Sequence, residues 1–179
     1  RTEFLKLLTP ESGDEETQYA AYHHVLEVLS PEPVIIRTFD LGGDKFLNEL
    51  EVNERNPFLG WRAIRVCLDR PELFEPQLRA ILRASAVGNA RIMIPMVTHV
   101  EQVVKMREQL GRVAESLVSS GEAIDEDIEI GIMVETPAAA LGIDLLLPYI
   151  DFVSLGTNDL TQYTLAVDRG SPYVAGLFD

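Results

Sequence analysis

Four short apolar runs recur along the chain: PVIIRTF at 33–39, ARIMIPMV at 90–97, EIGIMVE at 129–135 and IDFVSLG at 150–156. They are rich in β-branched residues and do not alternate strictly between apolar and polar positions. This pattern is typical of strands that are covered on both faces, as in a parallel sheet. Residues 1–5, RTEFL, are compatible with the end of a fifth strand.

Helical patterns separate these runs. Residues 15–29 begin with acids, which suit the positive end of a helix dipole, and Pro71 suits the first position of a second helix that ends before Gly88. A third helix is predicted to be capped by Thr98 and to end near Gly121. The residues expected to face inward are Ala20, Val25 and Leu29 in the first helix and Val100, Val103, Val104, Leu110, Val113 and Leu117 in the third.

Strands that alternate with helices of this length predict an α/β fold with right-handed crossovers. Two architectures remain open, namely a doubly wound sheet and a closed (β/α)8 barrel. A complete barrel takes about 250 residues, so a chain of 179 residues would hold only part of one. In both architectures ligands bind at the carboxyl ends of the strands.

Polar residues stand at these strand ends. Arg37 closes the first run, Glu135 closes the third, and Asn158 and Asp159 follow the fourth. Glu135 and Asp159 suit Mg²⁺, which binds one or two carboxylates and leaves its other positions to water and substrate. An alternative is that Glu135 pairs with a nearby arginine and that Asp159 caps a helix starting at Leu160.

Four arginines are candidates for binding an anion: Arg1, Arg37, Arg62 and Arg169. A guanidinium binds phosphate or carboxylate through two parallel N–H groups and keeps its charge when it is desolvated. The alternative for each is a surface pair with a neighbouring acid, because this chain is rich in acids. Arginines and a cation at one edge would together suit a small, multiply charged anion.

The charge balance narrows the function further. Fifteen Lys and Arg face 29 Asp and Glu, which gives a net charge of -14 without any basic block, so we expect no nucleic-acid binding. No apolar run is long enough to span a bilayer, and no secretory signal opens the chain. The single cysteine, Cys67, is expected in a helix core in a reducing compartment, so a soluble, cytoplasmic protein is predicted.

A set of motifs resembles a known family: RTEFL, RTFDLGGDK, NPFLGWRAIR, ILRASA, IMIPMVT, IGIMVETPAAA and FVSLGTNDLTQYTLAVDR. Together they resemble the phosphoenolpyruvate-binding domain of the phosphoenolpyruvate-protein phosphotransferases, enzyme I of the bacterial sugar phosphotransferase system. The resemblance extends over all 179 residues. It implies that residues 1–179 form part of one barrel domain, from about the second strand to the sixth.

The resemblance also implies the roles of individual residues. Glu135 and Asp159 would bind Mg²⁺, Asn158 would donate to the phosphate, and Asp159 would also lie against the substrate. The arginines that would hold the phosphate and carboxylate of phosphoenolpyruvate are Arg1, Arg37, Arg62 and Arg169. The expected reaction moves the phosphoryl group to a histidine and on to a histidine phosphocarrier protein, and it releases pyruvate.

Two parts of the family machinery do not match any position of this chain, namely the acceptor histidine and a cysteine that protonates the enolate. We therefore expect the chain alone to be inactive and, because a barrel cut between strands exposes unpaired edges, to form a homodimer or larger assemblies. Alternatives are a pyruvate phosphate dikinase or phosphoenolpyruvate synthase, another Mg²⁺-dependent pyruvate enzyme, a nitrogen-regulatory paralogue, and a non-catalytic phosphoenolpyruvate sensor. The ending YTLAVDR after GTNDLTQ argues against the dikinase.

Overall fold

The computed structural model describes residues 14–40 and 54–178. Its sheet contains four parallel strands, in the order β1-β2-β3-β4. Their bounds are Val34–Arg37 for β1, Ala90–Ile94 for β2, Glu129–Val134 for β3 and Phe152–Leu155 for β4. All four predicted strands are therefore confirmed, and the expected fifth strand at residues 1–5 lies outside the described residues.

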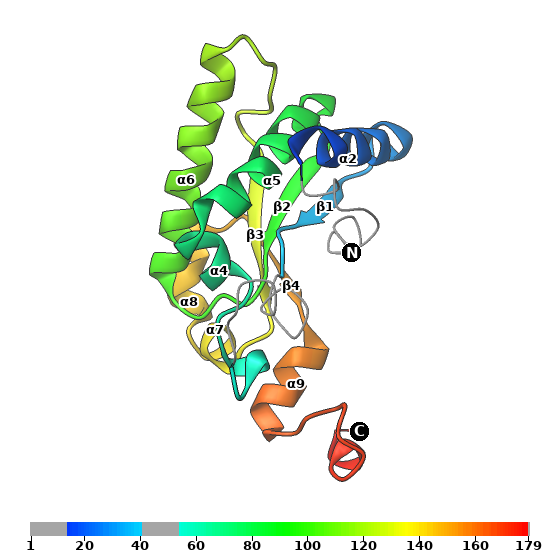
Figure 1. Cartoon of the computed structure of the whole chain (residues 1–179), viewed down its shortest axis with the longest axis vertical. Coiled ribbons are helices and arrows are strands. Elements are labelled where there is room, and N and C mark those ends of the chain that lie inside the picture. Colours follow the sequence, from blue (N-terminus) through cyan, green and yellow to red (C-terminus); the bar gives the residue numbers. More distant parts are fainter. Residues whose placement is uncertain (1–13, 41–53, 179) are drawn as a thin grey trace.

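Seven helices are described between and beside these strands (Figure 1). They are α2 (Glu15–Leu29), α4 (Ile64–Asp69), α5 (Pro71–Ala84), α6 (Val100–Ser119), α7 (Pro137–Leu141), α8 (Ile143–Leu146) and α9 (Thr157–Leu165). Short 3-10 turns add Pro57–Leu59, Ser85–Val87, Leu147–Tyr149 and Ala175–Leu177. In the described part of the chain, no helix combines the length and the apolar character that a bilayer-spanning segment needs.

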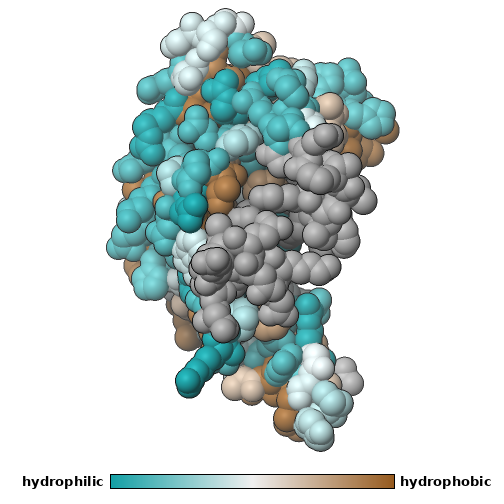
Figure 2. Space-filling view, viewed as in Figure 1, coloured by the Kyte–Doolittle hydropathy of each residue, from teal (hydrophilic) through white to brown (hydrophobic). Residues whose placement is uncertain are grey.

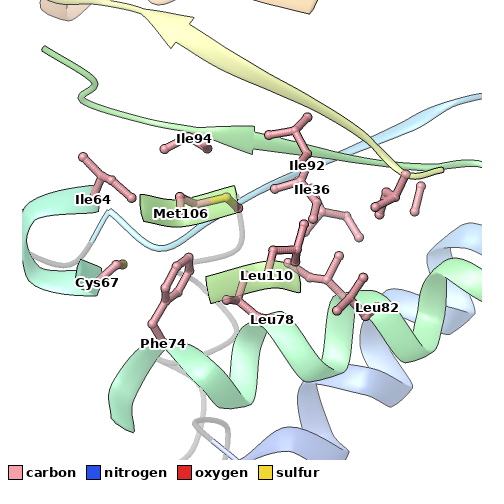
Figure 3. Close-up of a cluster of buried hydrophobic side chains, with 14 of the residues drawn as sticks. Ile36, Ile64, Cys67, Phe74, Leu78, Leu82, Ile92, Ile94, Met106 and Leu110 are labelled. Carbon is pink, nitrogen blue, oxygen red and sulfur yellow. The ribbon is translucent and has the colours of Figure 1, made fainter. Parts of the chain in front are cut away.

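The core lies between the sheet and α5 and α6. Ile36, Ile92 and Ile130 are opposite one another in adjacent strands and therefore share one face of the sheet, where each is buried. Figure 3 shows Ile36 and Ile92 in one cluster with Phe74 and Leu78 of α5. Burial of each such side chain contributes about 1.5–3 kcal/mol, so this layer is a main source of the sheet's stability.

The ends of α5 and α6 follow the predicted punctuation. Pro71 occupies the first turn of α5, and Gly88 after this helix has a φ of 94°, which glycine adopts without steric cost. Gly121 likewise follows α6 with a φ of 85°. The prediction that Thr98 caps α6 is wrong, because His99 occupies the N-cap and its backbone N–H donates to Oε1 of Gln102 at 3.1 Å.

The inward face of α2 differs from the prediction. Ala20 is exposed, and Val25 and Leu29 are 44% and 47% exposed. The buried residues are instead Gln18, Tyr22 and Leu26, which recur every four positions. A hydrophobic pattern misses this face because two of the three are polar and hydrogen-bond each other, with the hydroxyl of Tyr22 3.2 Å from Oε1 of Gln18.

The prediction for α6 succeeds. Its face toward the core includes Val103, Leu110, Val113 and Leu117, all buried, while Val100 and Val104 are partly buried. Cys67 lies in α4 and is 1% exposed, as expected of a helix-core residue.

The strand order also bears on architecture. A doubly wound sheet reverses its order where the chain switches direction, whereas these strands follow one another in chain order across the whole sheet. Right-handed crossovers between successive neighbours place their helices on a single face. The structure thus establishes an α/β fold with a parallel sheet that is wound in one direction.

Candidate functional site

The carboxyl ends of the four strands bring together side chains from distant parts of the sequence. The helices α4, α7 and α9, which lie together at one end of the sheet (Figure 1), border this edge. The residues that meet there are Arg37, Asp40, Arg62, Glu135, Asp159 and Tyr163, which we call the rim cluster. Sequence reasoning named four of them, and the structure adds Asp40 and Tyr163.

Glu135 follows β3 and is 2% exposed. Its Oε1 accepts a hydrogen bond of 2.7 Å from the backbone N–H of Met96, a residue whose φ is 58°. Burial raises the pKa of Glu135 to about 7, the Met96 N–H opposes this shift, and the charges of Asp159 and Asp40 add to it. The carboxyl group therefore lies in surroundings that disfavour its charge unless a cation is bound nearby.

Gly156, at the end of β4, lies directly against this carboxyl group. A Cβ at position 156 would stand 2.5 Å from Cβ of Glu135 and 2.8 Å from its Oε2. Only glycine permits this approach, so β3 and β4 can pack closely at the site.

Arg62 is held by a carboxylate on one edge of its guanidinium. Nε donates to Oδ1 of Asp40 at 3.1 Å and Nη2 donates to Oδ2 at 2.7 Å, which is the bidentate arrangement of a strong pair. Burial by itself would lower the pKa of Arg62, but the hydrogen bonds and the charge of Asp40 raise it above its ordinary value. The guanidinium therefore stays charged although it is buried.

Two further groups approach Arg62 from α9. Nη2 of Arg62 lies 3.7 Å from Oδ2 of Asp159, and Nη1 donates to the hydroxyl of Tyr163 at 3.1 Å. On the other side of Asp40, Nη1 of Arg37 lies 3.8 Å from Oδ2. Asp40 thus sits between two arginines, and Asp159 lies beside Arg62 and adds a like charge near Glu135.

The start of α9 corrects one alternative. The helix begins at Thr157 rather than Leu160, with Gly156 at the N-cap, so Asp159 lies in the first turn and does not cap it. The other alternative, a pairing of Glu135 with an arginine, stays open, because the charge of Arg37 acts on the Glu135 carboxyl group and lowers its pKa, while the hydrogen bond that this group accepts comes from the backbone N–H of Met96.

The structure describes two of the remaining predicted site residues, and both are exposed. Asn158 is exposed in the first turn of α9. Arg169 is also exposed, and its backbone N–H donates to Oε1 of Gln162 at 3.2 Å. Arg1 lies outside the described residues. The structure thus does not bring Asn158 or Arg169 into the rim cluster.

The residues that sequence reasoning missed differ in how far a pattern could have revealed them. Asp40 stands three positions after Arg37, and Tyr163 stands one helical turn after Asp159, so spacing from known candidates would have identified both. Met96 contributes a backbone N–H, and no side-chain pattern predicts such a role.

The carboxylates fit a hard divalent cation. Oε1 of Glu135 is engaged by Met96, and its Oε2 faces the start of the helix that carries Asp159. Within the described residues no group of three or more His, Cys, Asp or Glu is arranged to bind a metal. A Mg²⁺ site would not require such a group, because this ion takes one or two protein carboxylates and fills its other positions with water and substrate.

Comparisons with known proteins place these observations in a family. Residues 1–179 match the profile of a family described as PEP-utilising enzyme, PEP-binding domain. The chain is 47% identical over 180 residues to a phosphoenolpyruvate-protein phosphotransferase of Haemophilus influenzae. It is 49% identical over 179 residues to the protein of that name from Staphylococcus epidermidis.

These alignments cover 100% and 99% of this chain but only 31% of each relative. A Buchnera aphidicola protein of the same name gives 48% identity over 32% of its length. The chain therefore spans about a third of the length of these relatives. By its match over every residue, the chain belongs to the family of PEP-utilising enzymes, in the region of their PEP-binding domain.

Proposed function

We propose that this chain is the phosphoenolpyruvate- and Mg²⁺-binding part of a phosphotransferase. The enzyme moves the phosphoryl group from phosphoenolpyruvate to one of its own histidines and on to a histidine phosphocarrier protein, and it releases pyruvate. The observation that carries the proposal is the rim cluster, in which the buried Arg62, the partly buried Arg37 and three carboxylates meet at the carboxyl ends of the strands. Its support from outside the structure is the match to a PEP-binding domain.

The arginines bind the anion in this proposal. Asp40 occupies the Nε and Nη2 edge of Arg62 and so directs the remaining N–H groups of the guanidinium toward a ligand. Arg37 adds a second positive charge from the end of β1. Arg169 and Arg1 are proposed to complete the clamp, and Asn158 to donate a hydrogen bond to the phosphate.

Glu135 and Asp159 would hold Mg²⁺. When bound, the ion neutralises charge on the phosphoryl oxygens, which is the main requirement of phosphoryl transfer besides alignment. Without a cation, the burial that raises the pKa of Glu135 keeps its carboxyl group partly protonated near neutral pH. The side chain would then be a weaker ligand, so we expect affinity for Mg²⁺ to increase as pH rises through about 7 and to level off above it.

The reaction breaks the bond between phosphorus and the enol oxygen. The phosphoryl group passes to a histidine nitrogen, and the enolate takes a proton to become pyruvate. Both the acceptor histidine and the cysteine acid are proposed to lie outside this chain. For the cysteine acid the support is that the one cysteine of the sequence, Cys67, is buried in α4. The chain alone should therefore bind phosphoenolpyruvate without turning it over.

We further propose that the sheet is a segment of a (β/α)8 barrel. Its support is the strand order, together with Val153 and Leu155 of β4, which are 45% and 68% exposed. By register these two residues share a face with Ile132 and Val134, which are buried. Figure 2 shows apolar surface near the C-terminal segment, at the lower end of the molecule. More barrel elements, or a second copy in a homodimer, would cover the exposed face of β4.

The test is a calorimetric titration of phosphoenolpyruvate into the folded chain with and without Mg²⁺, with Asp159→Ala as the variant. We expect binding that depends on both Mg²⁺ and Asp159, and no pyruvate release. Asp127→Ala is a matched control, because Asp127 is exposed and lies just before β3, at the opposite end of this strand from Glu135. Binding that persists in Asp159→Ala would contradict the assignment of the metal ligand, and phosphate transfer by the chain alone would contradict its proposed division of roles.

A further inference from the structure

The hydroxyl of Tyr163 lies where three segments of the chain meet. It accepts a hydrogen bond from Nη1 of Arg62 at 3.1 Å, and it donates to the backbone carbonyl of Phe58. It also lies 3.9 Å from Sδ of Met96. The direction of the first bond is certain, because a guanidinium carries only donors, and the phenol proton is then left for the Phe58 carbonyl.

Both bonds require a neutral phenol. Burial raises the pKa of Tyr163, and the charge of Arg62 only partly offsets this shift. The hydroxyl therefore stays protonated at neutral pH and can accept from Arg62 while it donates to Phe58.

These bonds connect segments that follow the two edge strands of the described sheet. Tyr163 belongs to α9, which follows β4, whereas Phe58 and Arg62 lie between β1 and α4, and β1 and β4 are the first and last strands of the sheet order. Asp159 approaches Arg62 from the same helix only to 3.7 Å, which is too long for a hydrogen bond. The phenol thus supplies direct hydrogen bonds where the carboxylate does not.

The contacts also determine which part of Arg62 is available. Three of the five N–H groups of a guanidinium are engaged here, two by Asp40 and one by Tyr163. Asp40 holds one edge and Tyr163 holds Nη1, so the plane of the group cannot turn freely. The N–H groups that remain have a defined direction before any ligand arrives.

We propose that Tyr163 is a positioning residue of the anion site, which orients the Arg62 guanidinium for the phosphate or carboxylate of the substrate. This inference rests on the proposed function, because it takes phosphoenolpyruvate as the ligand. Tyr163 acts through Arg62 and through the segment at Phe58. It does not itself contact the reacting atoms.

The test uses Tyr163→Phe in the intact protein, because phenylalanine keeps the ring and removes only the hydroxyl. Calorimetric titration with phosphoenolpyruvate at a fixed Mg²⁺ concentration should show affinity about tenfold weaker, the usual effect of losing a hydrogen bond to a charged group. Tyr149→Phe removes a hydroxyl from a tyrosine that is 40% exposed and lies outside the rim cluster, and it should bind as the unchanged protein does.

A second readout needs no ligand. In nitrogen-15 spectra of the arginine side chains, Nη1 of Arg62 should give a sharp, slowly exchanging signal in the unchanged protein. In Tyr163→Phe this signal should broaden, because the group can then rotate. A merely structural role of Tyr163 would lower the melting temperature without this selective change at Arg62.

Val113→Ala is the control for stability, because it opens a cavity in the buried face of α6 away from the rim cluster. If Val113→Ala loses affinity to the same degree, or if Tyr163→Phe leaves affinity or the Arg62 signal unchanged, the proposal is overturned. If the unchanged protein binds no phosphoenolpyruvate, the proposed function fails and this inference fails with it. The titration of the unchanged protein therefore distinguishes the two failures.

Discussion

Glu135 carries a carboxyl group where water has little access, since it is 2% exposed. Burial raises its pKa from 4.5 to about 7, and the neighbouring charges of Asp159 and Asp40 add to the shift. The folded chain therefore binds a proton at this residue more tightly than the unfolded chain does. Folding stability therefore falls as pH rises, whereas an acid whose pKa is lowered by folding makes stability rise with pH.

The first prediction concerns this linkage in the absence of Mg²⁺. The stabilisation from Glu135 is complete below about pH 4.5 and is lost as pH rises through about 7, by up to about 3 kcal/mol. Glu135→Gln should lack this loss, so the difference in unfolding free energy between the variant and the unchanged chain should grow in favour of the variant over this range. Denaturant unfolding from pH 4.5 to 8 measures it, and parallel curves would show that the pKa is not shifted.

Ala63, next to Arg62, has a φ of 50° and a ψ of -128°. An L-residue with a side chain adopts such a conformation only at a cost of about 1–3 kcal/mol. The strained residue lies where the chain turns into α4, beside the rim cluster. Backbone strain at this position has a direct test, because glycine adopts the same angles without penalty.

Ala63→Gly should therefore raise the free energy of unfolding by about 1 kcal/mol, since removal of the strain outweighs the extra flexibility of the unfolded chain. Ala20→Gly is the matched control. Ala20 is exposed in the interior of α2, so the same change should lower stability by up to about 1 kcal/mol. Equal effects of the two substitutions would mean that Ala63 is not strained.

At the scale of elements, the site depends on how closely the end of β4 approaches β3. Gly156 permits this approach and also serves as the N-cap of α9, so one residue determines both where the helix begins and where Asp159 lies. The helix in turn brings Tyr163 one turn further toward Arg62.

Gly156→Ala should force these elements apart, because the new methyl group would stand 2.5 Å from Cβ of Glu135. We expect a loss of about 1–3 kcal/mol in stability and the loss of Mg²⁺-dependent binding of phosphoenolpyruvate. Gly176→Ala is the control, since a Cβ there meets no atom within 4 Å. Thermal unfolding and calorimetry measure both effects, and an unchanged affinity in Gly156→Ala would contradict the proposed approach of the two strands.

At the scale of the whole molecule, the last strand has apolar residues on a face that the described helices leave partly uncovered. Leu155 is 68% exposed, and Leu165 of the following helix is 50% exposed. Exposed apolar surfaces at a sheet edge favour association with another protein chain. The same feature agrees with the proposed barrel, which would bury them against its next element.

The chain by itself should therefore associate in sedimentation experiments at micromolar concentration, and Leu155→Lys should reduce this association. Val28→Lys is a matched control, because Val28 is 66% exposed but lies in α2. A monodisperse monomer that melts cooperatively, with no difference between the two variants, would contradict the prediction.

Local patterns were sufficient for much of this protein. The four strands, the limits of α5 and α6, and the strand-end positions of Arg37 and Glu135 follow from residues that are neighbours in sequence, because strand and helix periodicity is a local property. The motifs also sufficed to identify the family. The inward face of α2 was predicted wrongly, because Tyr22 and Gln18 satisfy each other's hydrogen bonds inside the core.

The tertiary structure alone decided how the site is assembled. Arg62 and Tyr163 are 101 residues apart in sequence, and the backbone N–H of Met96 reaches Glu135 across 39 residues. The raised pKa of Glu135 likewise arises from burial and from the charges of Asp159 in α9 and of Asp40 after β1. These features depend on hydrogen-bond geometry and on exclusion of water, which exist only once the strands have aligned their ends, so residue types and spacing cannot specify them.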